Sequence, residues 1–227
     1  MKTLLNWVNK YIPIYAIIPV ICIFVYQSSI YFGTKLVNHN LHHYDLTTSL
    51  DEKIPLLPVF SIIYLGCYIF WALNYLLVGR TGKKHFYQFV SCIFISYTLC
   101  GLIFIIFPTM IERPDIKVTS LSTALLNYVY VSDTPVNLFP SMHCLISWLC
   151  FIGIRNKKEI PRLYQIISLI IAILVCISTV TLKQHFVVDI IAGILIAELI
   201  YFISTHSKIS NTFYHFFESI NSKVNLK

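Results

Sequence analysis

The chain has 227 residues, of which 57% are hydrophobic and 12% are charged, and its formal net charge is +7. A soluble domain of this size normally has about a quarter of its residues charged, so this composition excludes an ordinary water-soluble globular protein and indicates an integral membrane protein. The basic residues form no single patch, which favours contact with anionic lipid over nucleic acid binding.

Six apolar stretches are long enough, or nearly long enough, to cross a bilayer, which requires roughly 20 helical residues. They cover residues 11–33, 59–79, 86–109, 141–154, 165–183 and 186–205. We expect an all-α polytopic bundle of six transmembrane helices that forms one membrane domain over residues 1–227. The fourth stretch is short, so we expect it either to begin within the membrane or to be extended by snorkelling residues.

Lysine and arginine are divided unevenly between two sets of loops. Twelve lie in the two terminal segments and in the second and fourth loops, whereas five lie in the first, third and fifth loops. The positive-inside rule therefore predicts that both termini are cytoplasmic and that the first, third and fifth loops face outward. Those three loops hold most of the unusual polar residues.

The first outward loop, residues 38–58, is rich in histidine. His39, His42 and His43 match no strong zinc spacing and no cysteine joins them, so an interfacial loop is favoured over a metal site. We expect this loop to cover a site formed with the other two outward loops. The candidates for substrate contact within it are Asp51 and Glu52.

The third loop contains Arg113, which Pro114 follows. An arginine guanidinium is suited to two-pronged binding of a phosphate. Read in isolation, however, this residue is better explained as an interfacial anchor. The segment 120–135 mixes aliphatic and aromatic residues, and we expect it to form a short interfacial helix over a catalytic pocket.

Residues 138–144, with the sequence LFPSMHC, predict the start of a helix. Pro140 ends the preceding structure, and Ser141 is a favourable N-cap for the fourth span. The free N–H groups of a helix N-terminus attract anions, and His143 lies in the first turn, where a proton donor to a bound anion could sit. Read alone, a capped helix beside an interfacial histidine is an equally good interpretation.

Residues 178–189, with the sequence STVTLKQHFVVD, lie between the last two apolar stretches. His185 and Asp189 share one helix face, so the carboxylate can hold one imidazole nitrogen and leave the other free to attack. Read alone, these two residues are equally well explained as a polar pair at a helix end whose side chains satisfy each other's hydrogen bonds. With Arg113 and His143 they supply the groups needed to hold a phosphate, attack it and protonate the departing oxygen.

Together these motifs resemble those of the type 2 phosphatidic acid phosphatase superfamily, which includes membrane lipid-phosphate phosphatases. The three signatures of that superfamily are Lys-x6-Arg-Pro, Pro-Ser-x-His and Ser-Arg-x5-His-x3-Asp. The residues that match them are Arg113-Pro114, the complete motif at 140–143, and Ser178, His185 and Asp189. Six spans with both termini inside also match the superfamily.

The resemblance implies a mechanism without a metal or another cofactor. His185 is the expected nucleophile and forms a phosphohistidine, while Asp189 orients its imidazole. His143 is the expected general acid for the departing oxygen. Backbone N–H groups are expected to hold the phosphoryl oxygens together with side chains. The expected side-chain ligands of the phosphate are Arg113, Ser141 and Ser178.

Two cationic positions of the signatures are lost, because Ile106 stands in place of the lysine and Thr179 in place of the arginine. Lys183 is the candidate to replace one of them, provided that a loop conformation lets it point at the phosphate. The loss of both cations resembles the sphingomyelin synthase and inositol phosphorylceramide synthase branch, which transfers head groups between lipids. A phosphodiester carries less negative charge than a phosphomonoester and needs fewer cations.

We therefore expect a multi-pass protein of the cell membrane that hydrolyses a lipid phosphate, a phosphomonoester or pyrophosphate, at its extracytoplasmic face. Transfer of a lipid phospho-head-group is the alternative within the same chemistry. A transporter, with His143, His185 and Asp189 as a proton relay, and a catalytically inactive lipid-binding relative are alternatives of other classes. The charged residues cluster on one side of the membrane, which disfavours the transporter.

Overall fold

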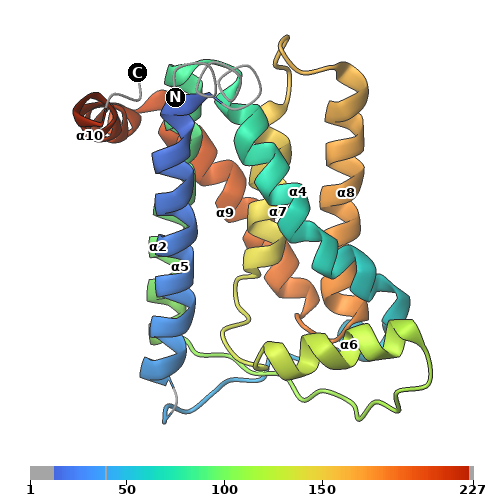
Figure 1. The fold of residues 1–227 in the computed structure, drawn as a ribbon. Helices are drawn as coiled ribbons and strands as arrows, with labels where there is room; N and C mark the ends of the chain where they lie inside the picture. Colours follow the sequence, from blue (N-terminus) through green and yellow to red (C-terminus); the bar gives the residue numbers. More distant parts are fainter. Residues whose placement is uncertain (1–12, 39, 225–227) are drawn as a thin grey trace.

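The computed structural model describes residues 13–38 and 40–224, and the regular secondary structure in these residues is helical, without a β-strand (Figure 1). The elements are α2 (Ile14–Asn38), α3 (Ser49–Lys53), η1 (Pro58–Phe60), α4 (Ser61–Gly79), α5 (Lys83–Ile106), α6 (Leu121–Ser132), α7 (Met142–Ile154), α8 (Arg162–Thr181), α9 (Val187–His206) and α10 (Ile209–Lys223).

Five helical segments among the described residues are long and apolar enough to cross a membrane, namely α2, η1 with α4, α5, α8 and α9. The sixth, α7, is apolar but has only 13 residues. The predicted all-helical membrane bundle with a short fourth span is therefore confirmed. Some boundaries differ: α2 continues to Asn38 and α5 already ends at Ile106. Residues 11 and 12 of the first predicted span lie outside the described residues.

The short helix α7 lies in the middle of the bundle and is almost completely buried among α4, α5, α8 and α9. Segment 133–141 enters the bundle without helical structure, so α7 begins inside the bundle rather than at its end (Figure 1). Non-helical backbone at membrane depth is stable only where protein surrounds it or where it lines a cavity. The start of α7 is thus a natural position for a site.

Close packing holds α7 in this central position. In lipid, helices associate through van der Waals packing and small residues rather than through burial from water. Gly153 of α7 illustrates this, because a Cβ atom there would lie 2.8 Å from the ring of Phe89 on α5. The large buried side chains Leu145, Ile146 and Leu149 of α7 belong to the same core.

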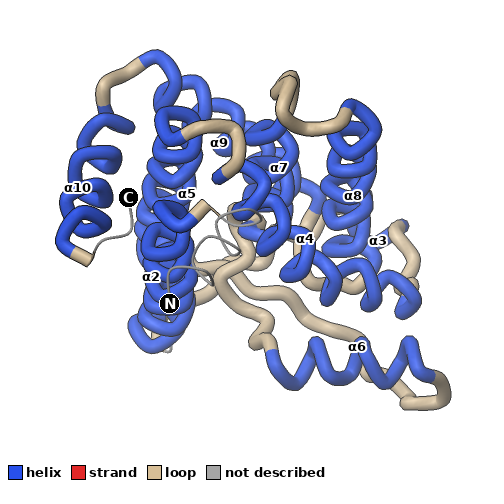
Figure 2. Tube along the Cα trace, turned by 45° about the horizontal axis from the view of Figure 1, so that its top comes forward, coloured by secondary structure: helices blue, strands red, loops and turns tan. Residues whose placement is uncertain are grey.

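The loops and short helices divide between the two ends of the bundle. The start of α2 and the helix α10 lie at one end, whereas α6 and the turn between α8 and α9 lie at the other (Figure 1). Figure 2 shows α6 joined to the bundle by long loops on both sides. The short helix predicted within 120–135 is thus present as α6. Assignment of its end of the bundle to the extracytoplasmic side stays a prediction.

Candidate active site

His185 lies in the tight turn that joins α8 to α9. The carbonyl oxygen of Thr179 accepts hydrogen bonds from the backbone nitrogens of Gln184 (2.9 Å) and His185 (3.2 Å), which ends α8. In the first turn of α9, Oδ2 of Asp189 lies 3.1 Å from His185 Nδ1 and accepts a 3.0 Å hydrogen bond from the Phe186 backbone nitrogen. Asp189 therefore caps the start of α9 and also holds the His185 imidazole in its orientation.

The pair formed by His185 and Asp189 is buried, with 7% and 0% of the two residues exposed. Burial by itself lowers the pKa of His185, but the hydrogen bond and the negative charge of Asp189 together outweigh it and leave the pKa raised. Because Nδ1 faces the carboxylate, Nε2 is the nitrogen available to a reacting group. The geometry is that of an oriented nucleophile or base.

The two histidine motifs are held against each other where α9 crosses the start of α7. The backbone nitrogen of Ser141 donates a 3.2 Å hydrogen bond to the carbonyl oxygen of Asp189, while the Ser141 hydroxyl accepts from the Cys144 nitrogen at 3.4 Å and caps α7. A Cβ atom at Gly193 would lie 2.8 Å from the Ser141 carbonyl oxygen. Glycine at this position is thus what allows the close approach of the two helices.

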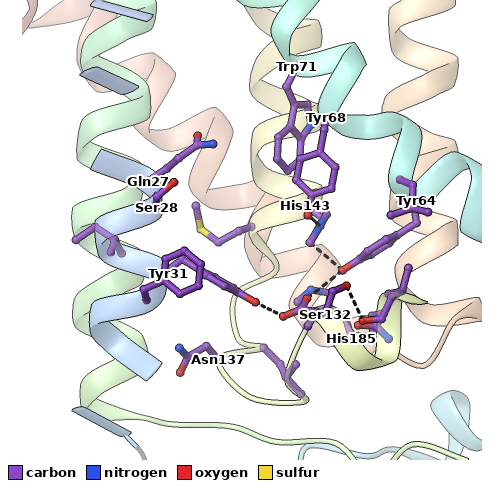
Figure 3. A pocket seen from close by; sticks show the side chains of 18 of the residues that line it. Gln27, Ser28, Tyr31, Tyr64, Tyr68, Trp71, Ser132, Asn137, His143 and His185 are labelled. Carbon is purple, nitrogen blue, oxygen red and sulfur yellow. Dashed lines mark hydrogen bonds between the residues drawn. The ribbon is translucent and has the colours of Figure 1, made fainter. Parts of the chain in front are cut away.

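His143, in the first turn of α7, faces His185 with 5.9 Å between the ring centroids. Its Nδ1 lies 3.4 Å from the Tyr64 hydroxyl and its Nε2 lies 3.4 Å from the Tyr68 hydroxyl, both on α4. Figure 3 shows these side chains around one common space. Two histidines from motifs 42 residues apart in the chain therefore meet at one place.

The two histidines line a cavity of about 440 Å³, within the usual range for a small-molecule site (Figure 3). Most of its wall is aromatic or aliphatic, as at Trp71 and Phe104. Besides the histidines, Asp133 and Gln184 are among its polar groups. No lysine or arginine of residues 13–38 and 40–224 lines the cavity.

A family model described as the PAP2 superfamily matches residues 38–203, which include all the motifs above. The chain belongs to the PAP2 superfamily. An uncharacterized protein of Methanocaldococcus jannaschii is 26% identical over 171 residues, which are 74% of this chain and 68% of that protein. No solved structure matches the chain.

Membership of the PAP2 superfamily confirms the resemblance seen in the sequence motifs. Members of the superfamily are generally phosphatases or phosphotransferases, which supports a function of this general type for the chain. The likeness to the sphingomyelin synthase branch stays a prediction. The remaining residues around the cavity show how far this PAP2 chain departs from the signatures of its superfamily.

Arg113 of the first PAP2 signature lies behind the cavity wall and does not line it. Its Nη1 donates to the carbonyl oxygens of Asp133 (2.6 Å) and Tyr130 (3.3 Å), and its Nη2 donates to Gln184 Oε1 at 2.6 Å. Burial lowers the pKa of Arg113, although the nearby Asp133 carboxylate opposes this effect. The guanidinium thus contacts two residues of the cavity wall, the Asp133 backbone and the Gln184 side chain, without lining the cavity itself.

Neither Lys183 nor Ser178 reaches the cavity wall. Lys183 does occupy a loop, with φ of 51°, but its Nζ donates to the carbonyl oxygens of Asp51 (2.8 Å) and Ile54 (2.7 Å) and so faces α3. Ser178 is completely buried within α8 and donates to the Val175 carbonyl oxygen at 2.6 Å. The geometry gives no support to their predicted roles as phosphate ligands.

A polar cluster that the sequence motifs did not identify surrounds Asp133, just after α6. Its Oδ1 accepts a hydrogen bond from the Tyr31 hydroxyl and pairs with Lys35 at 3.2 Å, and its Oδ2 lies 3.5 Å from the Tyr64 hydroxyl. Burial raises the pKa of Asp133, but the hydrogen bond from Tyr31 and the charge and hydrogen bond of Lys35 outweigh it, so the pKa is lowered. The carboxylate is thus ionised at neutral pH.

The loop between α2 and α4 packs on the site through Asp51. Its Oδ1 accepts a 2.8 Å hydrogen bond from the Val187 backbone nitrogen at the start of α9, and the residue is 7% exposed. Asp51 does not line the cavity, so the expected contact with substrate has no geometric support. Of the loop histidines, His42 and His43 belong to no potential metal-binding group within the described part of the chain, and His39 lies outside it.

Proposed function

We propose that this chain cleaves a phosphate ester or phosphoanhydride bond of a membrane lipid and that His185 is the nucleophile. The proposal is carried by two imidazoles that face one cavity: His185 is oriented by Asp189, and His143 lies 5.9 Å from it between ring centroids. The exposed residues Phe32 and Tyr128 also line the cavity, so the site is reachable from the surface of the bundle, as a lipid substrate requires.

In the first step, Nε2 of His185 attacks phosphorus, and the bond between phosphorus and the departing oxygen breaks. His143 donates a proton to that oxygen, so that a neutral alcohol or a protonated phosphate leaves. In the second step, water attacks the phosphohistidine, His143 accepts a proton from the water, and cleavage of the N–P bond releases phosphate. The N–H groups at the start of α7, beside Ser141, are suited to hold phosphoryl oxygens during both steps.

We place this reaction at the extracytoplasmic face of the cell membrane. The start of α7 and the turn between α8 and α9, which form the site, lie in the half of the bundle away from the start of α2 and the helix α10 (Figure 1). Within residues 13–38 and 40–224, the loops and helix ends on that opposite side hold nine of the fourteen lysines and arginines. This asymmetry supports a cytoplasmic location for that side and an extracytoplasmic location for the site.

A second candidate function is transfer of a phospho-head-group from one lipid to another. It is favoured by the absence of lysine and arginine from the cavity wall of the described residues. A phosphodiester carries one negative charge, so it needs less compensation than the dianion of a phosphomonoester. In this version an alcohol of the acceptor lipid replaces water in the second step, and the first step is unchanged.

The test is turnover by the purified protein in liposomes. The substrates are phosphatidate, phosphatidylglycerol phosphate, an isoprenoid pyrophosphate and a choline phosphodiester lipid, each with and without diacylglycerol as acceptor. We expect at least one to be cleaved, activity to persist in EDTA, and His185→Ala to lower it by at least about 10³-fold. The control is His42→Ala, which should retain activity because His42 is an exposed loop residue. Full activity of the folded His185→Ala protein would overturn the proposal.

A further inference from the structure

Gln184 separates Arg113 from the cavity. It precedes His185 directly, is 1% exposed and lines the cavity, whereas Arg113 does not. The backbone nitrogen of Gln184 is fixed by the 2.9 Å hydrogen bond to Thr179 at the end of α8. A side chain at this position is therefore held beside the nucleophile.

The direction of the Gln184 amide follows from its partner. A guanidinium only donates hydrogen bonds, so the atom 2.6 Å from Arg113 Nη2 is the carbonyl Oε1. Nε2 then lies on the other side of the amide, and no described residue accepts a hydrogen bond from it. A buried amide without a partner is unfavourable, so Nε2 is a donor ready for an acceptor that the protein itself does not supply.

The positions that carry cations in the PAP2 signatures offer no such donor. Thr179, at the arginine position, donates its hydroxyl proton to the Cys176 carbonyl oxygen at 2.7 Å. Ile106, at the lysine position, is a hydrophobic side chain that is 78% exposed. Among the described residues, the cavity wall next to His185 therefore lacks both cations but holds the unpaired neutral donor of Gln184.

We propose that Nε2 of Gln184 donates a hydrogen bond to a non-bridging oxygen of the phosphoryl group that His185 attacks. This inference rests on the proposed function and adds a phosphate ligand to it. Arg113 polarises the amide through Oε1, so its positive charge strengthens a donor that itself is neutral. A neutral donor compensates a dianion less well than a guanidinium does, so the site favours a singly charged phosphodiester over a phosphomonoester.

The test replaces Gln184 in the full-length protein and measures the affinity for vanadate by calorimetry. Gln184→Glu keeps an acceptor for Arg113 but has no donor, and Gln184→Met removes the donor without adding charge. We expect both variants to bind vanadate about 10- to 100-fold more weakly, as is usual for a lost hydrogen bond to a charged group. The thermal midpoint of each variant checks that it is folded.

Gln27→Glu is the matched control, because Gln27 lines the same cavity from α2, on the side opposite His185 in Figure 3. It adds the same negative charge to the cavity but leaves the Gln184 donor in place. We expect its vanadate affinity to fall less than that of Gln184→Glu. The ratio of phosphodiester to phosphomonoester turnover is a second readout, which we expect to fall in Gln184→Arg because this change adds a cation.

The outcomes separate this inference from the proposed function. If wild-type protein turns over a lipid phosphate and His185→Ala does not, the proposed function holds. In that case, a folded Gln184→Met protein that binds vanadate within about threefold of wild type overturns the role of Gln184. Equal losses in Gln27→Glu and Gln184→Glu, with none in Gln184→Met, overturn it as well, because charge alone then explains the effect.

Discussion

The phenol ring of Tyr64 stacks on the imidazole of His143 with 4.3 Å between the ring centroids, and its hydroxyl lies between His143 Nδ1 and Asp133 Oδ2. A hydroxyl that donates to the carboxylate can accept from the imidazole, so the three groups can form a chain that keeps a proton on His143. The distances of 3.4 and 3.5 Å are long for hydrogen bonds. Such contacts commonly tighten when a substrate binds.

Tyr64→Phe and Asp133→Asn should therefore impair protonation of the departing oxygen. We expect about a 10- to 100-fold loss of turnover with dodecyl phosphate, because an alkoxide is a poor leaving group and needs a proton. With p-nitrophenyl phosphate, whose leaving group needs no proton, the loss should be under about threefold. The measurement is the ratio of the two rates in detergent-solubilised protein.

Several polar and charged groups face Asp133 and His143, so the control variant for this prediction must lie outside them. They are Tyr31 and Lys35 on α2, Tyr64 and Tyr68 on α4, Arg113, and His185. Glu112→Gln removes an exposed carboxylate beside Arg113 and should leave both rates unchanged. Equal losses with both esters in Asp133→Asn would mean that Asp133 maintains the shape of the site rather than the proton on His143.

Asp189→Asn should change the pH dependence of turnover. The attacking nitrogen of His185 must be unprotonated, and Asp189 raises the pKa of His185, so the acid limb of the profile lies at higher pH than for an unperturbed histidine. Loss of the charge lowers this pKa, so we expect the acid limb to move to lower pH. The maximal rate should fall by about 10²- to 10⁴-fold, because the amide no longer holds the reactive tautomer.

The same pair also links stability to pH. Because the pKa of folded His185 is raised above its unfolded value, the pair stabilises the fold fully below the unfolded pKa. That stabilisation is lost as the pH rises through the folded pKa. Thermal midpoints measured across this range should fall with pH in wild type and change less in Asp189→Asn. An unchanged acid limb together with an unchanged stability profile would contradict the raised pKa.

The sequence was informative where chemistry follows local spacing. The interval of four residues from His185 to Asp189 predicts a contact between them, and the structure has it at 3.1 Å. The predicted shared helix face is wrong, because α9 begins only at Val187 and His185 lies in the turn before it. Ser141 caps α7 as predicted. The six apolar stretches predict the bundle because composition alone determines which segments remain in lipid.

The remaining parts of the site depend on contacts between distant segments, which no local pattern encodes. Asp133 meets Tyr31, which precedes it by 102 residues. Gln184 gains its importance only because Arg113, 71 residues earlier, holds its carbonyl oxygen. The position of Lys183 next to the histidine motif predicts a cation at the phosphate, but its side chain points instead to the carbonyl oxygens of Asp51 and Ile54.

Lys183→Met tests whether this lysine is a structural anchor. Loss of its hydrogen bonds to the Asp51 and Ile54 carbonyl oxygens should lower the free energy of unfolding by about 1–3 kcal/mol. Vanadate affinity should stay within about twofold of wild type, because Lys183 does not line the cavity. The exposed Lys53→Met is the control for loss of a lysine on the same surface. A tenfold loss of vanadate affinity without destabilisation would instead support the predicted role as phosphate ligand.

Gly193→Ala tests the contact that joins the two histidine motifs. The added Cβ atom would lie 2.8 Å from the Ser141 carbonyl oxygen and 3.3 Å from the Leu145 nitrogen, so α9 must move away from the start of α7. We expect destabilisation of about 1–3 kcal/mol, as for overpacking of a core. Turnover should fall as well, because His185 and Asp189 move with α9.

Gly66→Ala in α4 is the matched control for Gly193→Ala. A Cβ atom at Gly66 would meet nothing within 4 Å, so this change should leave the thermal midpoint unchanged or raise it slightly through helix propensity. The measurements are the thermal midpoint in detergent and the rate with the preferred lipid substrate. If Gly193→Ala matched Gly66→Ala in both, the spacing between α7 and α9 would not control the distance between the two histidines.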